Sequence, residues 1–200
     1  MSRATKNPLT AAFAGSSVRR TRELEAAGIS RVRLSLAVEQ GFVEKVDRGL
    51  YRLARAKVGE NHSLAAAVKR VPQGVVCLQS ALRFHNFTTQ SPHEVWLALP
   101  RKAWHPEPGS LPLRFVWFSG PALTEGIEIH RVEGVDVRVY SPAKTVADCF
   151  KYRGKIGLDV ALEALREAWR ERRCTMDELM HFARICRVAN VVRPYAESLT

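Results

Sequence analysis

Residues 21–53 read TRELEAAGISRVRLSLAVEQGFVEKVDRGLYRL, and they predict two helices, a turn between them and a following β-hairpin. Thr21 and Ser30 are expected to cap the two helices, because their hydroxyl oxygens can accept hydrogen bonds from the free N–H groups at a helix start. Gly28 and Gly41 suit the left-handed conformation that ends a helix. Two helices joined by a short Gly-containing turn have the order of a helix-turn-helix.

The second helix is expected over residues 31–40 and has an apolar side and an open side. At about 100° per residue, Leu34, Ala37 and Val38 fall together and would pack on the first helix. Polar side chains near its N-terminal end could then reach base edges in the major groove of DNA. These candidate DNA-binding residues are Ser30, Arg31, Arg33 and Ser35.

Three residues at the centre of the open side fit DNA binding less well. They are Val32, Leu36 and Glu39. Leu36 stands where a polar or basic residue is expected, and the Glu39 carboxylate would repel phosphate. That repulsion is tolerable if the C-terminal end of the helix lifts from the DNA, or if Glu39 pairs with a nearby arginine.

The next stretch, FVEKV-DRG-LYRL, predicts a hairpin with a three-residue turn. After a helix-turn-helix, a hairpin is the wing of a winged helix, and wing cations contact phosphates. The phosphate-binding candidates are Lys45, Arg48 and Arg52 on the hairpin, with Arg19, Arg20 and Arg22 at the entry to the first helix. The alternative is a small three-element module with a solvated basic surface.

The charge of the chain is concentrated in this N-terminal part. The 200 residues include 31 Lys and Arg against 20 Asp and Glu, a net charge of +11. Residues 1–58 hold 12 and 5 of these, so under a third of the chain carries +7. A concentrated excess indicates a surface for an anionic partner such as nucleic acid. The polar stretch 57–62 reads as a linker, which predicts a DNA-binding domain over residues 1–58 and a second domain over residues 63–200.

The second domain is expected to be α+β. A helix at 62–71 precedes strands at 74–78, 95–99, 113–118, 126–131 and 135–140, of which the last two would form a hairpin. From Ser141 the apolar period becomes helical, and Thr175 begins a capping box. The prediction is therefore a winged helix-turn-helix followed by a larger domain, with a mostly antiparallel sheet and C-terminal helices.

Enzymatic, metal and membrane functions find little support in the sequence. No apolar run approaches the roughly 20 residues of a membrane helix, and no signal-peptide core is present, so a cytoplasmic protein without a membrane partner is expected. The four cysteines and six histidines lack metal-ligand spacing, and no Gly-rich phosphate loop or nucleophile elbow occurs. We therefore expect no metal, no cofactor and no catalytic residue.

Some polar residues of the second domain invite a functional interpretation. Lys144 and Asp148 could bind phosphate or serve a nuclease-like site, but the favoured interpretation is an exposed helix pair worth about 0.2–0.5 kcal/mol. His85 is expected to be a hydrogen-bonded structural residue. Arg170, Arg172 and Arg173 form a basic run that is expected to be a solvated helix end.

Several blocks of the sequence resemble one family. They are RGLYRLA (48–54), SALRFH (80–85), PHEVWLALP (92–100) and SPAKTVADCFKYRGKIGLDVALEALREA (141–168). Together with the predicted helix-turn-helix, they resemble the AbiEi antitoxins of bacterial type IV toxin–antitoxin systems, which act in abortive infection, a phage defence. The resemblance covers roughly residues 15–190.

The resemblance implies a winged-helix DNA-binding domain joined to an antitoxin domain. It also implies a repressor that binds repeats in its own promoter and counteracts a co-encoded nucleotidyltransferase-like toxin without a stable complex. The matching DNA-binding positions are Ser30, Arg31, Arg33, Arg48 and Tyr51. Two alternatives stay open: a regulator without a toxin, whose second domain binds an effector or dimerises, and a nucleic-acid-processing enzyme.

Overall fold

The computed structural model describes residues 8–90, 92–103 and 106–199, and their contacts fall into two units. The first unit comprises residues 8–72, 106–112 and 131–137. The second comprises residues 73–103, 113–130 and 138–199 without residue 91. The first unit continues past residue 58, because Lys69 and Arg70 form ion pairs with Glu23 and Asp47.

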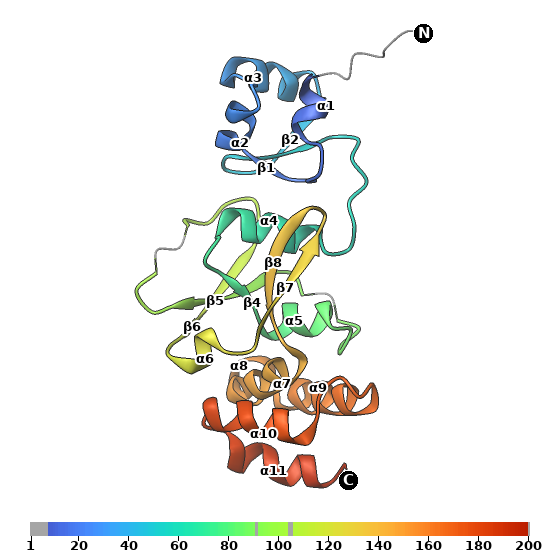
Figure 1. Ribbon diagram of the computed structural model, residues 1–200, viewed down its shortest axis with the longest axis vertical. Helices are drawn as coiled ribbons and strands as arrows, with labels where there is room; N and C mark the ends of the chain where they lie inside the picture. Colours follow the sequence, from blue (N-terminus) through green and yellow to red (C-terminus); the bar gives the residue numbers. More distant parts are fainter. Residues whose placement is uncertain (1–7, 91, 104–105, 200) are drawn as a thin grey trace. The chain divides into compact units, whose positions relative to one another are not determined.

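The first unit combines short helices with a three-stranded antiparallel sheet (Figure 1). In chain order its elements are α1 (Pro8–Ala12), β1 (Arg19–Arg20), α2 (Thr21–Ala26), α3 (Arg31–Glu39), β2 (Val43–Asp47), β3 (Leu50–Leu53) and α4 (His62–Arg70). The strand order is β1-β3-β2. The core of the helices and one face of the sheet consists of Leu9, Ala12, Phe13, Leu24, Ile29, Leu34, Ala37 and Val43.

The predicted turn and the second helix cap are confirmed. The Ser30 hydroxyl accepts a hydrogen bond from the Arg33 N–H at 3.3 Å and so caps α3. Gly28 has a φ of +82°, a conformation that favours glycine. Next to it, Ile29 is almost fully buried and donates its N–H to the Leu24 carbonyl. The turn therefore fixes α3 against α2.

Two local predictions were wrong. Thr21 does not cap α2 but is its first residue, because the Glu23 carboxylate accepts the Arg20 N–H at 2.7 Å and closes the helix start one residue earlier. The hairpin turn has two residues, Arg48 and Gly49, instead of three. A bulge between Lys45 and Asp47 extends β2, so that Asp47 pairs with Leu50.

The second unit is built on a five-stranded sheet of order β6-β5-β4-β8-β7. Its strands are β4 (Val75–Val76), β5 (Val95–Pro100), β6 (Leu113–Phe118), β7 (Ile127–Val132) and β8 (Val135–Tyr140), with α5 (Leu78–Phe84) and the short α6 (Pro121–Thr124) between them. The predicted β7–β8 hairpin is confirmed. The fold class is therefore mixed α+β.

The prediction of a mostly antiparallel sheet was wrong. β5 pairs with β4 antiparallel, but β5 with β6 and β4 with β8 are parallel. The connection between β5 and β6, residues 101–112, is long enough to cross over and let the two strands run in the same direction. A crossover between parallel strands needs about a dozen residues, whereas a hairpin uses about two to five.

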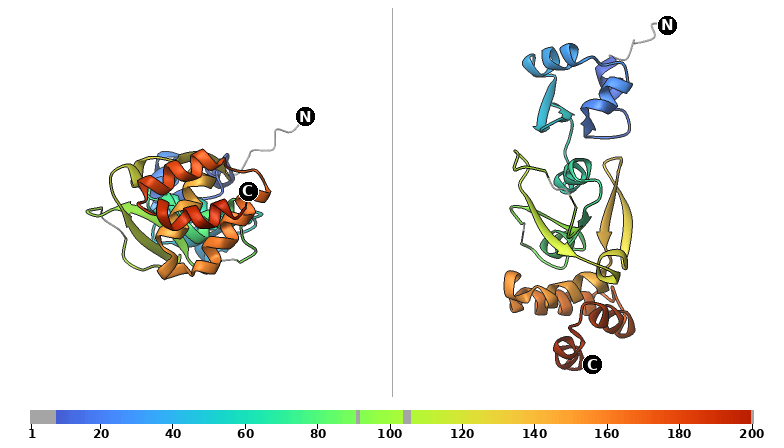
Figure 2. Two further views of the ribbon diagram at one scale, coloured as in Figure 1. Left: turned by 90° about the horizontal axis from the view of Figure 1, so that it is seen from below. Right: turned by 90° about the vertical axis from the view of Figure 1, so that its left-hand side faces the viewer.

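The remaining helices form one group (Figures 1 and 2). They are α7 (Pro142–Lys151), α8 (Arg153–Ile156), α9 (Leu158–Arg170), α10 (Met176–Ile185) and α11 (Ala189–Glu197). Ser141 caps α7 and the capping box at Thr175 and Glu178 starts α10, both as predicted. α7 packs against α5, α9, α10 and α11, and nine of its ten residues are buried.

The prediction that Lys144 and Asp148 form an exposed pair was wrong. Their side chains are 0% and 1% exposed, and the Lys144 Nζ lies 2.6 Å from both carboxylate oxygens of Asp148. The Cys186 thiol also donates to Asp148 at 3.1 Å. Burial raises the pKa of the Asp148 carboxyl, and the Lys144 ammonium opposes that shift. Because helices enclose α7, the pair has no solvated face.

His85 is a buried structural residue, as predicted, and it makes stability depend on pH. Its Nε2 donates to the Tyr140 carbonyl at 2.7 Å, and burial lowers the pKa of the imidazole. The neutral ring is thus favoured in the folded state. We expect the free energy of unfolding to decrease as the pH falls below about 6.5, because the His85 imidazole then binds a proton in the unfolded chain and stays neutral in the folded one.

Urea denaturation between pH 8 and pH 5 tests this expectation. His85→Gln should flatten the loss of stability in that range. His181→Gln, at an exposed position, is the matched control and should leave the loss in place. Identical pH profiles for His85→Gln and the unmodified protein would contradict the assignment.

None of the helices in the described part of the chain is long and apolar enough to cross a bilayer. Likewise, the described residues contain no group of three or more His, Cys, Asp or Glu side chains that could hold a metal ion.

Candidate nucleic-acid interface

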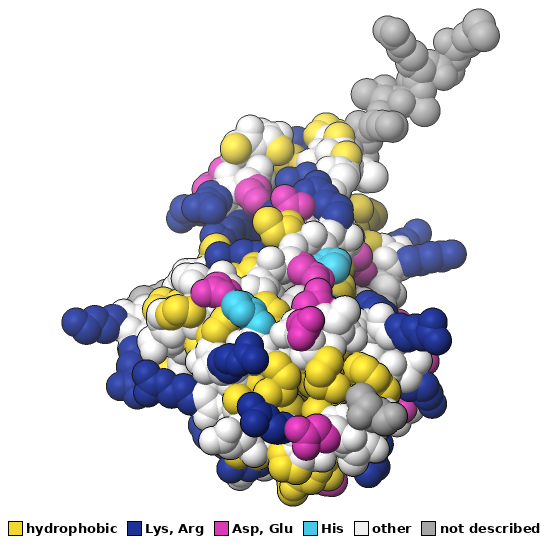
Figure 3. Space-filling view, turned by 60° about the horizontal axis from the view of Figure 1, so that its bottom comes forward, with side chains coloured by type: hydrophobic (Ala, Val, Ile, Leu, Met, Phe, Trp, Pro, Cys, Tyr) yellow, Lys and Arg dark blue, Asp and Glu magenta, His cyan; other side chains and the backbone are white. Residues whose placement is uncertain are grey.

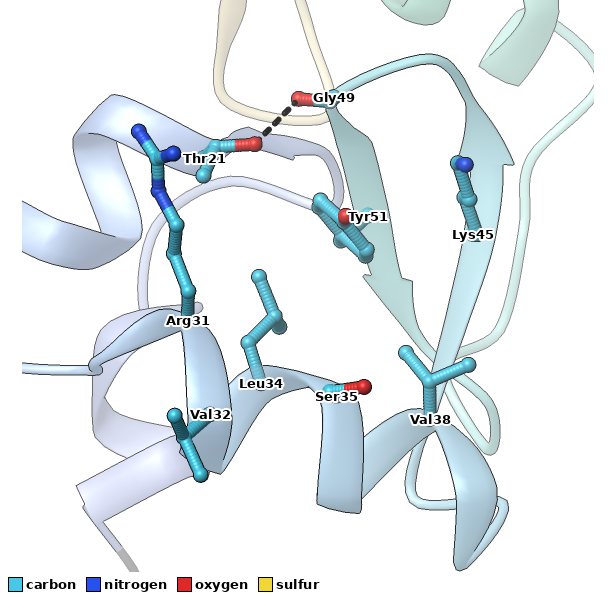
Figure 4. Close-up of a pocket in the computed structure, with 9 residues that line it drawn as sticks. All are labelled: Thr21, Arg31, Val32, Leu34, Ser35, Val38, Lys45, Gly49 and Tyr51. Carbon is cyan, nitrogen blue, oxygen red and sulfur yellow. Dashed lines mark hydrogen bonds between the residues drawn. The ribbon is translucent and has the colours of Figure 1, made fainter.

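A surface groove of about 740 Å³ lies between α3 and the β2–β3 hairpin of the first unit (Figure 4). The residues that line it come from the start of α2, from α3 and from both hairpin strands: Thr21, Arg31, Val32, Leu34, Ser35, Val38, Lys45, Gly49 and Tyr51. Three of the predicted DNA-binding residues, Arg31, Ser35 and Lys45, therefore meet in one groove. The Thr21 hydroxyl donates to the Gly49 carbonyl at 3.4 Å and joins the start of α2 to the hairpin turn.

Strand register places Lys45 and Tyr51 on the groove side of the sheet. The two residues lie opposite each other in the β2–β3 pair, so their side chains share one face. Tyr51 packs against the core that includes Leu34 of α3, which fixes this face toward the helix. Lys45, by contrast, is exposed and presents its ammonium to solvent at the groove.

The opposite face of the hairpin carries the next pair, Glu44 and Arg52. They are also opposite each other in register, and the Arg52 guanidinium contacts the Glu44 carboxylate at 2.5 Å. Arg20 pairs in register with Leu50, so it lies on this second face too, where burial lowers the pKa of its guanidinium. The structure therefore separates Arg52 and Arg20 from the groove, although both were grouped with Lys45 in the sequence.

The predicted residues of α3 divide between its two flanks. Arg31 and Ser35 face the groove, whereas at about 100° per residue Arg33 falls on the other flank of the open side. Arg31 is 79% exposed, and its Nε donates to the Glu25 carboxylate at 2.6 Å, which raises the pKa of the guanidinium. Ser30 serves as the helix cap.

The remaining predicted cations are two exposed arginines and one arginine of strand β1. Arg22 and Arg48 are exposed, Arg48 being at the tip of the hairpin. Arg19 donates from its Nη2 to the Ala14 carbonyl at 2.6 Å and lies opposite Tyr51 in register. None of these three side chains lines the groove.

Comparison with known families finds that this part of the chain is similar to a family of regulators. Its model, described as a transcriptional regulator and AbiEi antitoxin, matches from Val18 to Ala54. We refer to residues 18–54, the part of the chain that this model matches, as the AbiEi segment. Every element that lines the groove lies within the AbiEi segment. The matched family consists of regulatory antitoxins, not of enzymes.

The fold of the chain is similar to a solved structure of greater length. The crystal structure of RV2827C protein from Mycobacterium tuberculosis superposes with a TM-score of 0.57 and covers 88% of this chain and 69% of that one. The two sequences are 11% identical, so the likeness concerns the fold. No curated protein matches the sequence.

The acidic residue next to the hairpin turn, Asp47, is buried and held by hydrogen bonds and an ion pair. Asp47 is 3% exposed, and its carboxylate accepts the N–H groups of Arg48 at 2.7 Å and Ser110 at 3.2 Å. The Arg70 guanidinium lies 3.3 Å from the same carboxylate. A Cβ at Gly109 would come within 2.2 Å of Asp47, so this contact requires glycine. The tip is thus left with the exposed Arg48 as its outward charge.

Sequence reasoning missed part of the groove. Thr21 and Val38 were assigned only to capping and packing, and Tyr51 was singled out only by the family resemblance. Alternation along the hairpin could have found Tyr51, because it shares a face with Lys45.

Elsewhere, the face drawn in Figure 3 shows Lys and Arg dispersed among acidic and apolar side chains. Within the basic run, Arg170 pairs with Glu167 and Glu171.

Proposed function

We propose that residues 1–58 act as a winged-helix domain that binds double-stranded promoter DNA. The observation that carries the proposal is the sorting of charge on the hairpin. Lys45 and Arg48 point outward at the groove and the tip, while Glu44 and Asp47 are each held by an arginine on the other side or in the interior. A hairpin that exposes its cations and holds its carboxylates in ion pairs favours the binding of a polyanion such as DNA.

The geometry supports distinct roles for the exposed residues. α3 would enter the major groove, where Arg31, Arg33 and Ser35 reach base edges and Ser30 holds the helix start. Lys45 and Arg48 would bind phosphates, which fix the register of the protein on the duplex. Arg22 and Arg19 are further phosphate contacts. Arg20 and Arg52 lie on the far face of the sheet and have no role in this arrangement.

The family match extends the proposal to the biology of the chain. We infer that the protein is a cytoplasmic bacterial repressor of its own operon and the antitoxin of a type IV system. Residues 63–200 would counteract a nucleotidyltransferase-like toxin encoded beside it, without forming a stable complex. The support is the AbiEi match at residues 18–54.

The first experiment is a binding titration on the DNA upstream of the gene and on random DNA of equal length, at two salt concentrations. Tighter binding to the upstream DNA at both salts would support the repressor. Equal and salt-labile binding to both DNAs would overturn it, because phosphate attraction alone does not distinguish sequences.

A second experiment separates repression from antitoxin activity. The Arg31→Ala/Lys45→Ala variant, made in the full chain, should lose repression of a promoter reporter. It should still restore growth to cells that express the adjacent toxin. Loss of both activities in a folded variant would contradict the assignment of toxin neutralisation to residues 63–200.

Arg33→Ala should lower sequence preference rather than overall attraction. One bidentate arginine–guanine contact contributes about 1–3 kcal/mol of discrimination, so the ratio of affinities for upstream and random DNA should fall roughly 5- to 160-fold. Arg22→Ala removes the same charge from an exposed site on α2 and should lower the affinity for upstream and random DNA by the same factor. Equal losses on both DNAs for Arg33→Ala would exclude base reading by this side chain.

A further inference from the structure

Two apolar side chains are exposed at the centre of the open side of α3. Val32 is 72% exposed and Leu36 is 49% exposed, and the two lie one helical turn apart. The same helix buries Leu34 and Ala37 in the core, so its packing needs are met without them. These are the residues that fitted a polar, base-reading surface least well, and neither phosphate binding nor core packing accounts for them.

The surroundings of this pair favour DNA over a protein partner. Val32 lines the groove together with Arg31, Ser35 and Lys45, so cations and a hydroxyl lie beside the apolar surface. Two side chains are also far smaller than the apolar patch of several hundred Å² that marks a protein interface. An anionic partner that carries isolated apolar groups fits both features.

We propose that Val32 and Leu36 recognise thymine through its C5-methyl group in the major groove. This inference rests on the proposed DNA binding by α3. The thymine methyl is the apolar group that the major groove offers, and aliphatic side chains contact it. Four residues of helix rise about 6 Å, and base pairs are spaced about 3.4 Å apart. With α3 along the groove, the two recognised thymines would lie about two base-pair steps apart.

The test replaces each thymine of the bound upstream sequence by deoxyuridine, one at a time. This change removes the methyl group and leaves every hydrogen-bonding group in place. We expect the unmodified protein to lose affinity at two positions, by roughly three- to fivefold at each, as burial of one methyl group suggests. Val32→Ala should be insensitive to deoxyuridine at one of these positions, and Leu36→Ala at the other.

Phe42→Ala is the matched control. Phe42 is 58% exposed and lies just after α3, so its removal also deletes an exposed apolar side chain. It should retain full sensitivity to deoxyuridine at both positions. Because all three sites are exposed, thermal unfolding of the variants should match that of the unmodified protein.

The outcomes separate this inference from the proposed function. Selective binding to upstream DNA that tolerates deoxyuridine everywhere would overturn thymine recognition and leave the repressor standing. Absence of selective binding would overturn the proposed repressor, and thymine recognition with it. If Val32→Ala and Leu36→Ala changed the sedimentation of the free protein but not its sensitivity to deoxyuridine, the face would be a contact between copies, and thymine recognition would be wrong.

Discussion

Lys144→Met should lower the free energy of unfolding by about 3–5 kcal/mol, the range found when one partner of a buried ion pair is removed. The Lys144 Nζ lies 2.6 Å from both oxygens of Asp148, and both side chains are shielded from water. The ammonium also lies 4.1 Å from the centre of the Tyr140 ring, a cation–π contact. Without it, Asp148 is left as a buried carboxylate that has lost its ammonium partner and still accepts a hydrogen bond from the Cys186 thiol at 3.1 Å. Urea denaturation at neutral pH measures the loss.

Two further variants show whether burial is the cause. Lys144→Met/Asp148→Leu removes both charges and should recover most of the stability, because apolar groups of similar volume can replace a buried pair. Arg170→Met breaks the pair with Glu167, in which the Arg170 side chain is 69% exposed, and should cost at most about 0.5 kcal/mol. A loss below 1 kcal/mol for Lys144→Met would mean that the pair is solvated.

The deficit of Lys144→Met should also shrink in acid. Burial raises the pKa of Asp148, and loss of the ammonium removes the main influence that opposes this shift. The folded variant then binds a proton at a higher pH than the unfolded chain, whose Asp pKa is about 3.9. A group with a raised pKa in the folded state gains stability as the pH falls. A deficit that stayed constant from pH 7 to pH 4 would contradict this account.

Local features of the chain were predictable from the sequence. The Ser30 cap, the turn at Gly28 and the capping box at Thr175 depend on backbone groups within a few residues, and each was correctly placed. Thr21 shows the limit of such reasoning. Two residues could start α2, and the Glu23 contact to the Arg20 N–H decided between them.

Features that depend on distant segments were not predictable in the same way. Lys144 and Asp148 have the spacing of a surface pair, and only the helices packed around α7 make them interior. The parallel pairing of β5 and β6 likewise depends on how a long connection runs, which residue patterns do not encode. Within the hairpin, alternation would have separated Lys45 from Arg52, since strand residues of opposite parity face opposite sides.

Removal of the two exposed cations of the hairpin tests the proposed DNA interface directly. Lys45→Ala/Arg48→Ala should reduce the slope of log affinity against log salt by about 1.8, since each phosphate contact contributes about 0.9. At about 0.1 M salt the affinity for any DNA should fall roughly ten- to a hundredfold. Both side chains are exposed, so the fold should be unaffected. Affinity titrations on upstream and random DNA at several salt concentrations measure both quantities.

Lys45→Ala and Arg52→Ala form a matched pair within the same hairpin. Each removes one positive charge, but Lys45 lines the groove, whereas Arg52 lies on the other face against Glu44. If DNA lies in the groove, Lys45→Ala lowers the salt slope by about 0.9 and Arg52→Ala leaves it nearly unchanged. Equal effects would mean that total charge governs binding. A larger effect of Arg52→Ala would place the DNA on the opposite face of the sheet, and α3 could then not be the helix that reads it.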